Sequence, residues 1–320
     1  MQNYFKKLVA VFALIMALPV MAQSYPQRPI TLVVPFAPGG GTDSIARDLG
    51  KLLTEKLGQP IIVENKGGGG GSIGANAVAK ANPDGYTLLL ATSTFATNSA
   101  IEESLPFNPE KDFAPVAMIG RGPILIVASK NSGIKTLDQL ITQAKKNQAI
   151  NYCSAGNGSI NHLSAELFKQ KTGTSMTHIP YKGSGPATID LIAGRTQIFF
   201  STVPTILSHI NSNSVELVAV TGSKRLALFP QTPSTSEFGL KGFDISTWWG
   251  ILAPANTPKD IVAKLNQAIN EVSNKDAVKG RLLNEGATIT TGSPMDFQNN
   301  LNSELSMWRN LVKTAGLKGS

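Results

Sequence analysis

The sequence has very few of the side chains from which catalytic and metal sites are built. It contains one cysteine and three histidines in 320 residues. A single cysteine forms no internal disulfide, and no two histidines have the spacing that holds a metal on a helix. We therefore expect no metal and no cofactor, and a chain of this length can be held together by hydrophobic packing alone.

The single cysteine, Cys153, lies between Tyr152 and Ser154 in a predicted strand. This position is typical of a small buried hydrophobic residue, and the alternative is a reactive thiol. The first interpretation predicts that Cys153 contributes to packing and not to chemistry.

The sequence also lacks any cluster of positive charge. Its 29 Lys and Arg residues and 21 Asp and Glu residues give a net charge of +8, but the basic residues are scattered, with no run of five. This pattern argues against a nucleic-acid-binding surface. The positive balance instead favours small acidic ligands.

Long apolar runs are absent except at the N-terminus. Two lysines precede 13 uncharged residues, 8–20, and Val20-Met21-Ala22 has the small residues of a cleavage site. This pattern is typical of a secretory signal peptide over residues 1–22, and the run is short for a membrane span. The alternative, an uncleaved anchor, lacks a basic flank after the apolar run. Gln23 stands where a lipid anchor needs cysteine.

Cleavage leaves 320 − 22 = 298 residues, a natural length for two domains of roughly 150 residues. Strand and helix patterns alternate in both halves. Predicted strands at 30–34, 61–63 and 86–91 are separated by helices, which is typical of a doubly wound parallel sheet. A second alternating series begins after two apolar strands at 116–119 and 124–128.

The turn 120–123 between those two strands predicts a change of lobe, and a strand at 246–253 returns to the first lobe. We therefore predict an α/β protein of two lobes, each a mostly parallel sheet flanked by helices. The first lobe comprises residues 23–122 plus 247–320, and the second comprises 123–246. No low-complexity linker separates them, so the crossing strands are expected to act as the hinge.

Two glycine-rich turns carry the clearest functional signal. An apolar strand runs into a turn that opens a helix at 33–43, and the same order recurs at 150–162. The first N–H groups of a helix have no partner within it, and small residues leave them accessible to an anion such as a carboxylate. One such turn in each half predicts two lobes that hold one small acid between them.

The glycine-rich stretch 69–74 matches two enzyme patterns, but neither is complete. As G-x-G-x-x-G it resembles a dinucleotide fingerprint, but the next strand ends without the acidic residue that binds ribose. As G-x-S-x-G around Ser72 it resembles a nucleophile elbow, but the preceding strand ends too early, near Glu64. We therefore expect a binding protein and not an enzyme.

Other segments supply candidate contacts, each with a plainer alternative. The turn after strand 86–91 offers hydroxyl donors and an apolar wall, or is an ordinary polar loop. Lys182 faces a ligand acid or is solvated, and His162 contacts the ligand or caps its helix. The pair Trp248-Trp249 is interpreted as core between the lobes rather than as a binding platform.

Several short motifs follow one another along the chain: Tyr25-Pro26-x-Arg28-Pro29-Ile30, Pro38-Gly39-Gly40-x-x-Asp43, Pro83-Asp84-Gly85-Tyr86-Thr87-Leu88, His178-x-Pro180-Tyr181-Lys182-Gly183, Trp248-Trp249-Gly250 and Ala253-Pro254-x-x-Thr257-Pro258. In this order they resemble the periplasmic solute-binding proteins of tripartite tricarboxylate transporters, the Bug family. The resemblance covers essentially the whole chain after the signal peptide.

The resemblance implies a two-lobed, type II periplasmic-binding-protein fold and ligands that are mostly carboxylates. It implies that the loop matching 38–43 meets one carboxylate, partly through ordered waters, and that loops 156–162 and 181–186 approach from the second lobe. The family often has an aspartate after the strand matching 197–200, where this chain has Ser201-Thr202. A ligand that needs a negative partner, such as an amino group, is therefore not expected.

We predict a monomeric periplasmic protein, with no nucleic-acid partner, that captures a small carboxylate and delivers it to the permease subunits of a tripartite transporter. The alternatives are a ligand sensor for a signalling receptor and a serine hydrolase. Thr42 and its neighbours would offer backbone donors, and Asp43 would shape the helix cap. The predicted ligand-binding residues are Gly40, Gly41, Thr42, Asp43, Ser93, Thr94, Phe95, Asn157, Gly158, Ser159, His162, Lys182, Gly183 and Ser201.

Overall fold

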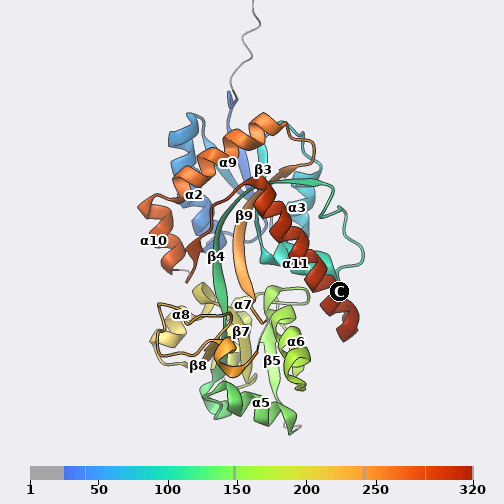
Figure 1. Ribbon diagram of the computed structural model, residues 1–320, viewed down its shortest axis with the longest axis vertical. Coiled ribbons are helices and arrows are strands. Elements are labelled where there is room, and N and C mark those ends of the chain that lie inside the picture. Colours follow the sequence, from blue (N-terminus) through green and yellow to red (C-terminus); the bar gives the residue numbers. More distant parts are fainter. Residues whose placement is uncertain (1–24, 40, 147–148, 241–242, 285, 319–320) are drawn as a thin grey trace, which may run out of the picture.

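Figure 1 shows the computed structural model of the protein, which describes residues 25–39, 41–146, 149–240, 243–284 and 286–318. Two α/β bodies lie one above the other along the long axis, and two long strands run between them. The predicted signal peptide, residues 1–22, and Gly40 lie outside the described residues. Within the described residues, no helix combines the length and the apolar character needed to cross a membrane.

The first lobe is the upper body in Figure 1 and is built on three parallel strands in the order β2-β1-β3. Strand β1 is buried along almost its whole length, which is typical of a parallel strand covered by helices on both faces. Its elements are β1 (Ile30–Val34), α2 (Gly41–Leu57), β2 (Ile61–Asn65), α3 (Ser72–Ala79), β3 (Thr87–Thr92), α4 (Ser93–Ile101), α9 (Lys259–Ser273), α10 (Asp276–Asn284), β10 (Thr288–Ile289) and α11 (Pro294–Ala315).

The second lobe is the lower body, and its strands β6, β5 and β7 are parallel to one another. Helix α6 is buried along most of its length, and its residues Leu163 and Phe168 are fully buried. The elements of this lobe are α5 (Leu137–Lys145), β5 (Asn151–Ser154), α6 (Ile160–Thr172), β6 (Thr177–Pro180), α7 (Ser184–Ile192), β7 (Ile198–Thr202), α8 (Val203–Asn211) and β8 (Val215–Val220).

The lobes are joined by β4 (Phe113–Ser129) and β9 (Ser246–Pro254), which pair with each other in antiparallel orientation. The prediction of two strands separated by a turn at 120–123 was wrong, because β4 is one strand of 17 residues. The glycines serve close packing instead of a turn. A Cβ atom at Gly120 would lie 2.8 Å from a methyl group of Leu282, and one at Gly122 would lie 3.1 Å from Ala287.

Strand β4 changes its partners midway. It pairs with β9 as far as Pro123, and from Ile124 onward it pairs with β7 and β8. This change of partners falls between residues 122 and 124, where the sequence predicted the lobe boundary. The extent of each lobe as a moving body stays a prediction.

The strand directions make the two lobes face each other through equivalent edges. Strand β9 is antiparallel to both β3 and β4, so β1 and β3 run with β4 toward the second lobe. Strand β7 is antiparallel to β4 and parallel to β5, so the parallel strands of the second lobe run toward the first. The carboxyl ends of both parallel sets therefore point at the junction of the lobes, which is where open α/β sheets bind ligands.

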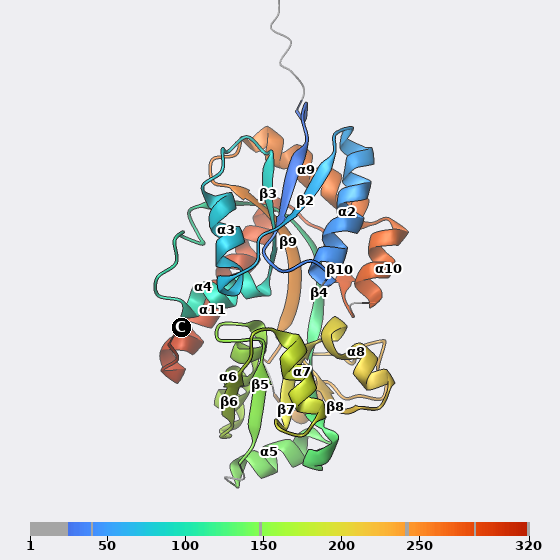
Figure 2. The same ribbon diagram turned by 180° about the vertical axis from the view of Figure 1, so that it is seen from behind.

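The described residues form three hydrophobic clusters, of which two each belong to one lobe and the largest spans both. The spanning cluster joins α4, α6 and α11 through side chains such as Ile101, Ile160 and Leu305. Each fully buried side chain of this size contributes about 1.5–3 kcal/mol relative to exposure. The lobes are therefore packed against each other along one side, as Figure 2 shows at α4, α11 and α6.

Both tryptophans of the pair 248–249 are buried, but in different places. Trp248 belongs to the cluster that spans the lobes, as predicted, whereas Trp249 belongs to the cluster of the first lobe. Cys153 is fully buried, and burial raises the pKa of its thiol to about 11. The packing role predicted for Cys153 is therefore confirmed.

Candidate functional site

The turn between β1 and α2 is held by one buried carboxylate. Asp43 is 4% exposed, and its Oδ2 atom accepts a hydrogen bond from the Gly39 N–H at 2.9 Å. Arg47 binds both carboxylate oxygens at 3.0 Å, and Asn65 donates to Oδ1 at 2.9 Å. Chiefly because of the Arg47 hydrogen bonds, the pKa of Asp43 falls to about 2. Asp43 therefore shapes the turn, and its charge is balanced inside the lobe.

Thr42 ties the same turn to the strand that joins the lobes. Its Oγ1 atom lies 3.3 Å from Nε1 of Trp249 in β9 and accepts a hydrogen bond from it. Gly41 is the first residue of α2. The sequence predicted Thr42 but missed Asn65, whose role depends on β2 lying beside β1. It also missed Arg47, although the spacing of four residues from Asp43 on one helix is a signal that could have found it.

The turn before α6 also uses its own side chains to satisfy its backbone. Ser159 is the N-cap residue, and its hydroxyl accepts from the His162 N–H and donates to the Gly156 carbonyl. Nδ1 of His162 accepts from the Gly158 N–H at 3.3 Å. This corrects the expectation of a turn with unpaired N–H groups, because those of Gly156, Gly158, Ser159 and His162 have partners within the protein. Asn157 remains exposed at the tip of the turn.

The aromatic rings of Tyr152, His178 and His162 form a stack beside the turn before α6. The rings of His162 and His178 are parallel with centroids 4.0 Å apart, and Tyr152 stacks on His178 at 4.9 Å. Nε2 of His178 lies 2.6 Å from the Ser154 hydroxyl, which accepts from the Gly156 N–H. Sequence reasoning proposed His162 but no role for His178, because the two histidines come from different elements.

Both histidines of the stack are neutral over the usual pH range. Burial lowers the pKa of His162 to about 4 and that of His178 to about 3, and the nearby Lys169 acts in the same direction. Glu166 accepts hydrogen bonds from Tyr152 and Lys169 beside the stack. A neutral His162 is the form whose Nδ1 can accept the Gly158 hydrogen bond.

The ligand contacts predicted after β3, namely Ser93, Thr94 and Phe95, lie in different surroundings. Ser93 is fully buried, and its hydroxyl donates to Thr247 in β9 at 3.1 Å, which differs from the predicted role of ligand donor. Thr94 is half-buried in the first turn of α4. Phe95 stacks on Phe107 with ring centroids 5.8 Å apart and lines a small cavity. Its role as an apolar wall for the ligand stays a prediction.

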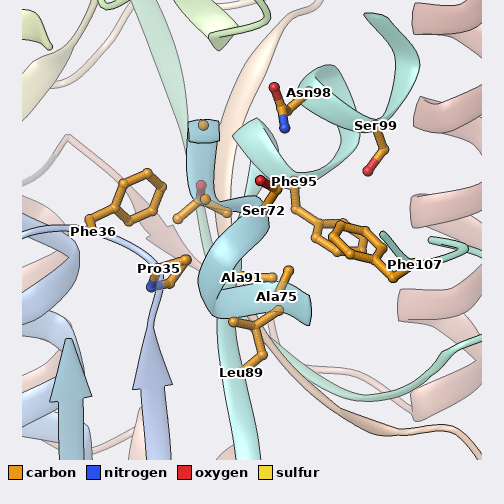
Figure 3. Close-up of a pocket in the computed structure, with 13 residues that line it drawn as sticks. Pro35, Phe36, Ser72, Ala75, Leu89, Ala91, Phe95, Asn98, Ser99 and Phe107 are labelled. Carbon is orange, nitrogen blue, oxygen red and sulfur yellow. The ribbon is translucent and has the colours of Figure 1, made fainter. Parts of the chain in front are cut away.

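That cavity lies in the first lobe, between the turn after β1, the glycine-rich stretch before α3, and α4 (Figure 3). About 10 Å³ of it is open to the centre of a water molecule, which is room for about one water. The Ser99 hydroxyl is buried without a hydrogen-bond partner in the described part of the chain. The cavity is lined by Pro35, Phe36, Gly70, Gly71, Ser72, Ala75, Leu89, Ala91, Thr92, Phe95, Asn98, Ser99 and Phe107.

The remaining predicted residues lie at strand ends of the second lobe. Lys182 is exposed in the turn before α7, and Gly183 is the N-cap of that helix with φ of 108°. The Gly183 N–H donates to the Ala155 carbonyl, so this turn packs beside the turn before α6. Ser201 is fully buried in β7, and its hydroxyl donates to the Thr202 carbonyl.

One approach between predicted elements of opposite lobes involves Gly158. Its backbone packs against Asn98 and Ile101 of α4. Figure 2 shows the starts of α2 and α7 at the facing ends of the two lobes. The structure therefore brings together the strand-end turns of both lobes. Their contacts with a ligand stay predictions.

The chain is similar to known proteins of one family. The model of the tripartite tricarboxylate transporter family receptor matches residues 45–317. The chain is 38% identical over 305 residues to protein BugT of Bordetella pertussis (strain Tohama I), and the match covers 94% of each chain.

Two solved structures share the fold. One is Rpa4515 of R. palustris with adipate, which is 35% identical with a TM-score of 0.84 over 92% of this chain and 99% of that one. The other is the periplasmic binding protein BugD, which is 33% identical with a TM-score of 0.82 over 92% of this chain and 100% of that one.

The fold is thus the two-lobed α/β fold of periplasmic binding proteins, as predicted. The chain belongs to the receptor family of tripartite tricarboxylate transporters, which includes the Bug proteins. The resemblance inferred from the sequence motifs is confirmed. This is a family of solute-binding receptors and not one defined by catalysis.

Proposed function

We propose that the protein captures a small organic acid, as its carboxylate, between the two lobes and delivers it to the membrane permease of a tripartite tricarboxylate-type transporter. The observation that carries this proposal is the facing arrangement of the strand ends, with a glycine-rich turn at each side of the junction. A relative with the same fold, Rpa4515, was solved with adipate, which is a dicarboxylate.

The proposed ligand contacts differ in kind between the lobes. In the first lobe, Gly41 and Thr42 at the start of α2 offer backbone donors, and Thr94 adds a hydroxyl. In the second lobe, Asn157 and Lys182 are exposed and supply an amide and a positive charge. Charge-assisted hydrogen bonds contribute roughly 1.5–3 kcal/mol each. Asp43, Ser159 and His162 hold the two turns in shape, and their direct contacts with the ligand stay predictions.

The residues at the end of β7 narrow the ligand class. Ser201 and Thr202 carry no charge, and Ser201 is fully buried. An ammonium group on the ligand would find no negative partner at this strand end. We therefore propose an organic acid without an amino group.

The proposal includes the cellular route. Residues 1–22 would direct the chain to the periplasm and be removed, leaving a monomer. The lobes 23–122 plus 247–320 and 123–246 would move as two bodies about β4 and β9. Ligand binding at facing edges would stabilise the closed arrangement that the permease receives.

A thermal-shift screen followed by calorimetry tests the proposal. We expect one or more of succinate, malate, adipate, citrate or benzoate to raise the unfolding temperature, because a ligand at 100 times its Kd stabilises the native state by about 2.7 kcal/mol. Adipamide is the neutral control for adipate, and glutamate is the amino-acid control. The proposal fails if no carboxylate binds, or if the neutral amide binds as well as the acid.

A further inference from the structure

One contact between the lobes is made by a residue without a side chain. Gly158, in the turn before α6, lies against α4 of the first lobe. A Cβ atom at Gly158 would lie 2.8 Å from Oδ1 of Asn98 and 2.8 Å from Cγ2 of Ile101. Real Cβ atoms do not approach other atoms this closely, so a side chain here must displace one of the two lobes or the neighbouring side chains.

The two neighbours of Gly158 are not free to move away. Ile101 is 2% exposed within the cluster that spans the lobes. Asn98 is 7% exposed, and its Nδ2 donates to the Gly69 carbonyl at 3.3 Å. A Cβ atom at Gly70 would lie 2.7 Å from Oδ1 of Asn98. The Asn98 amide is therefore enclosed by two glycines, one from each lobe.

Asn98 also lies next to the second-lobe turn that is proposed to approach the ligand, because Gly158 belongs to that turn. The Asn98 side chain lines the cavity of the first lobe, on the same side as Phe95 (Figure 3). Sequence reasoning singled out the stretch 92–98 for its hydroxyls and Phe95 but gave Asn98 no role. Its role is visible only in the tertiary structure, where Gly158 of the second lobe lies next to it.

Building on the proposed function, we propose that Asn98 is a positioning residue that sets how closely the lobes approach each other around the ligand. The Asn98–Gly158 contact lets the backbone of the second-lobe turn reach α4 directly. A methyl group at residue 158 would hold the lobes apart. Because the ligand is gripped from both sides, the added separation would stretch every hydrogen bond from one lobe, and such bonds weaken steeply with distance.

Gly158→Ala would also strain the backbone of its own turn, and this effect must be separated from the contact with the first lobe. Gly158 has φ of +73°, which any other residue adopts with strain. Gly173, at the other end of α6, has φ of +61° and nothing within 4 Å of its Cβ position. Gly173→Ala therefore carries a similar backbone strain without touching the first lobe and is the matched control.

The test compares Gly158→Ala with Gly173→Ala in two measurements. The first is the distance between spin labels on Lys80→Cys and Lys145→Cys, which are exposed in opposite lobes, measured by pulsed dipolar spectroscopy without ligand. The native Cys153 is fully buried and does not compete for the label. The second is the Kd for the carboxylate found in the screen.

We expect Gly158→Ala to lengthen the distance between lobes and to raise the Kd about tenfold or more relative to Gly173→Ala. In Asn98→Ala/Gly158→Ala, removing the amide relieves one of the two close contacts of the methyl group and leaves the one with Ile101. The loss of affinity in the double variant should therefore be smaller than the sum of the losses in the two single variants. Equal distances and equal Kd values in the two alanine variants would overturn the proposal. If the wild type binds no carboxylate, the proposed function fails, and the distance measurement still tests the contact.

Discussion

The two helix-start turns have the same sequence plan but are held in different ways. In the first lobe, the turn is fixed by a charged network in which Asp43 binds Arg47, Asn65 and the Gly39 N–H. In the second lobe, the turn is fixed by neutral groups, namely the Ser159 hydroxyl and the His162 imidazole. In each turn, some of the backbone N–H groups therefore donate to side chains of the same turn.

This difference decides which lobe offers charge to an anion. The negative charge of Asp43 is balanced by Arg47 within the first lobe, so this turn presents little net charge. The second lobe has neutral imidazoles behind its turn and the exposed Lys182 beside it. We infer that the first lobe provides directed backbone donors and that the second provides the positive charge.

The largest expected effect comes from removing the charged centre of the first turn. Asp43→Ala leaves Arg47, Asn65 and the Gly39 N–H without their partner and should lower the free energy of unfolding by about 3 kcal/mol. Urea denaturation measures the loss.

The matched control for Asp43→Ala is Asp48→Ala on the same helix. Asp48 pairs with Arg281, and both side chains are about one-third exposed. Because such an exposed pair contributes little, Asp48→Ala should lower the free energy of unfolding by less than about 1 kcal/mol. If Asp43→Ala costs no more than Asp48→Ala, the charged network does not hold the turn.

Acid should unfold the two turns in different pH windows. His162 has a lowered pKa of about 4, so below about pH 6.5 the unfolded state binds the proton first and stability falls as pH drops toward 4. Asp43 has a lowered pKa of about 2, so its contribution is present above about pH 4 and is lost as pH falls toward 2.

Denaturation curves at successive pH values test this separation, and the expected loss between pH 6.5 and 4 is about 1–3 kcal/mol. His162→Gln keeps an amide acceptor but has no titratable ring. It should reduce the loss of stability in the upper window, to which the lowered pKa of His178 also contributes, and leave the lower window unchanged. An unchanged slope between pH 6.5 and 4 in His162→Gln would show that His162 does not cause the loss.

The smallest expected change is at the helix cap of the second turn. Ser159→Ala removes the hydroxyl that accepts from the His162 N–H and should cost about 1 kcal/mol of stability. Thr136→Ala removes the equivalent cap of α5, away from the junction, at a similar cost. Only Ser159→Ala should also weaken carboxylate binding, so equal Kd values in the two variants would contradict a role for this turn.

Much of the fold follows from the sequence because its signals are local. The apolar strand predicted at 30–34 is β1, and the helix predicted to open after the turn 33–43 is α2, with Ile45 and Leu49 buried on it. The cap at Ser159 also lies where the sequence expects a helix start. The break expected at 120–123 does not exist, because glycines that serve tight packing against α10 look in sequence like glycines of a turn.

The candidate site was predictable in outline and not in detail. Asp43 and His162 were found as members of their turns, yet their partners Asn65 and His178 come from other elements. Ser93 has the right residue type but is turned toward Thr247, since its place in the first turn of α4 directs it to β9. Side-chain direction depends on packing that one segment does not encode.

The sequence by itself determined the alternation of strands and helices, the two glycine-rich turns and the family, because each is written in residues close together in the chain. Only the tertiary structure decided that β4 is one strand, that charge holds one turn and neutral rings the other, and that Gly158 meets Asn98. These features join residues tens of positions apart, and their energies arise from packing and burial that exist only once both lobes have folded.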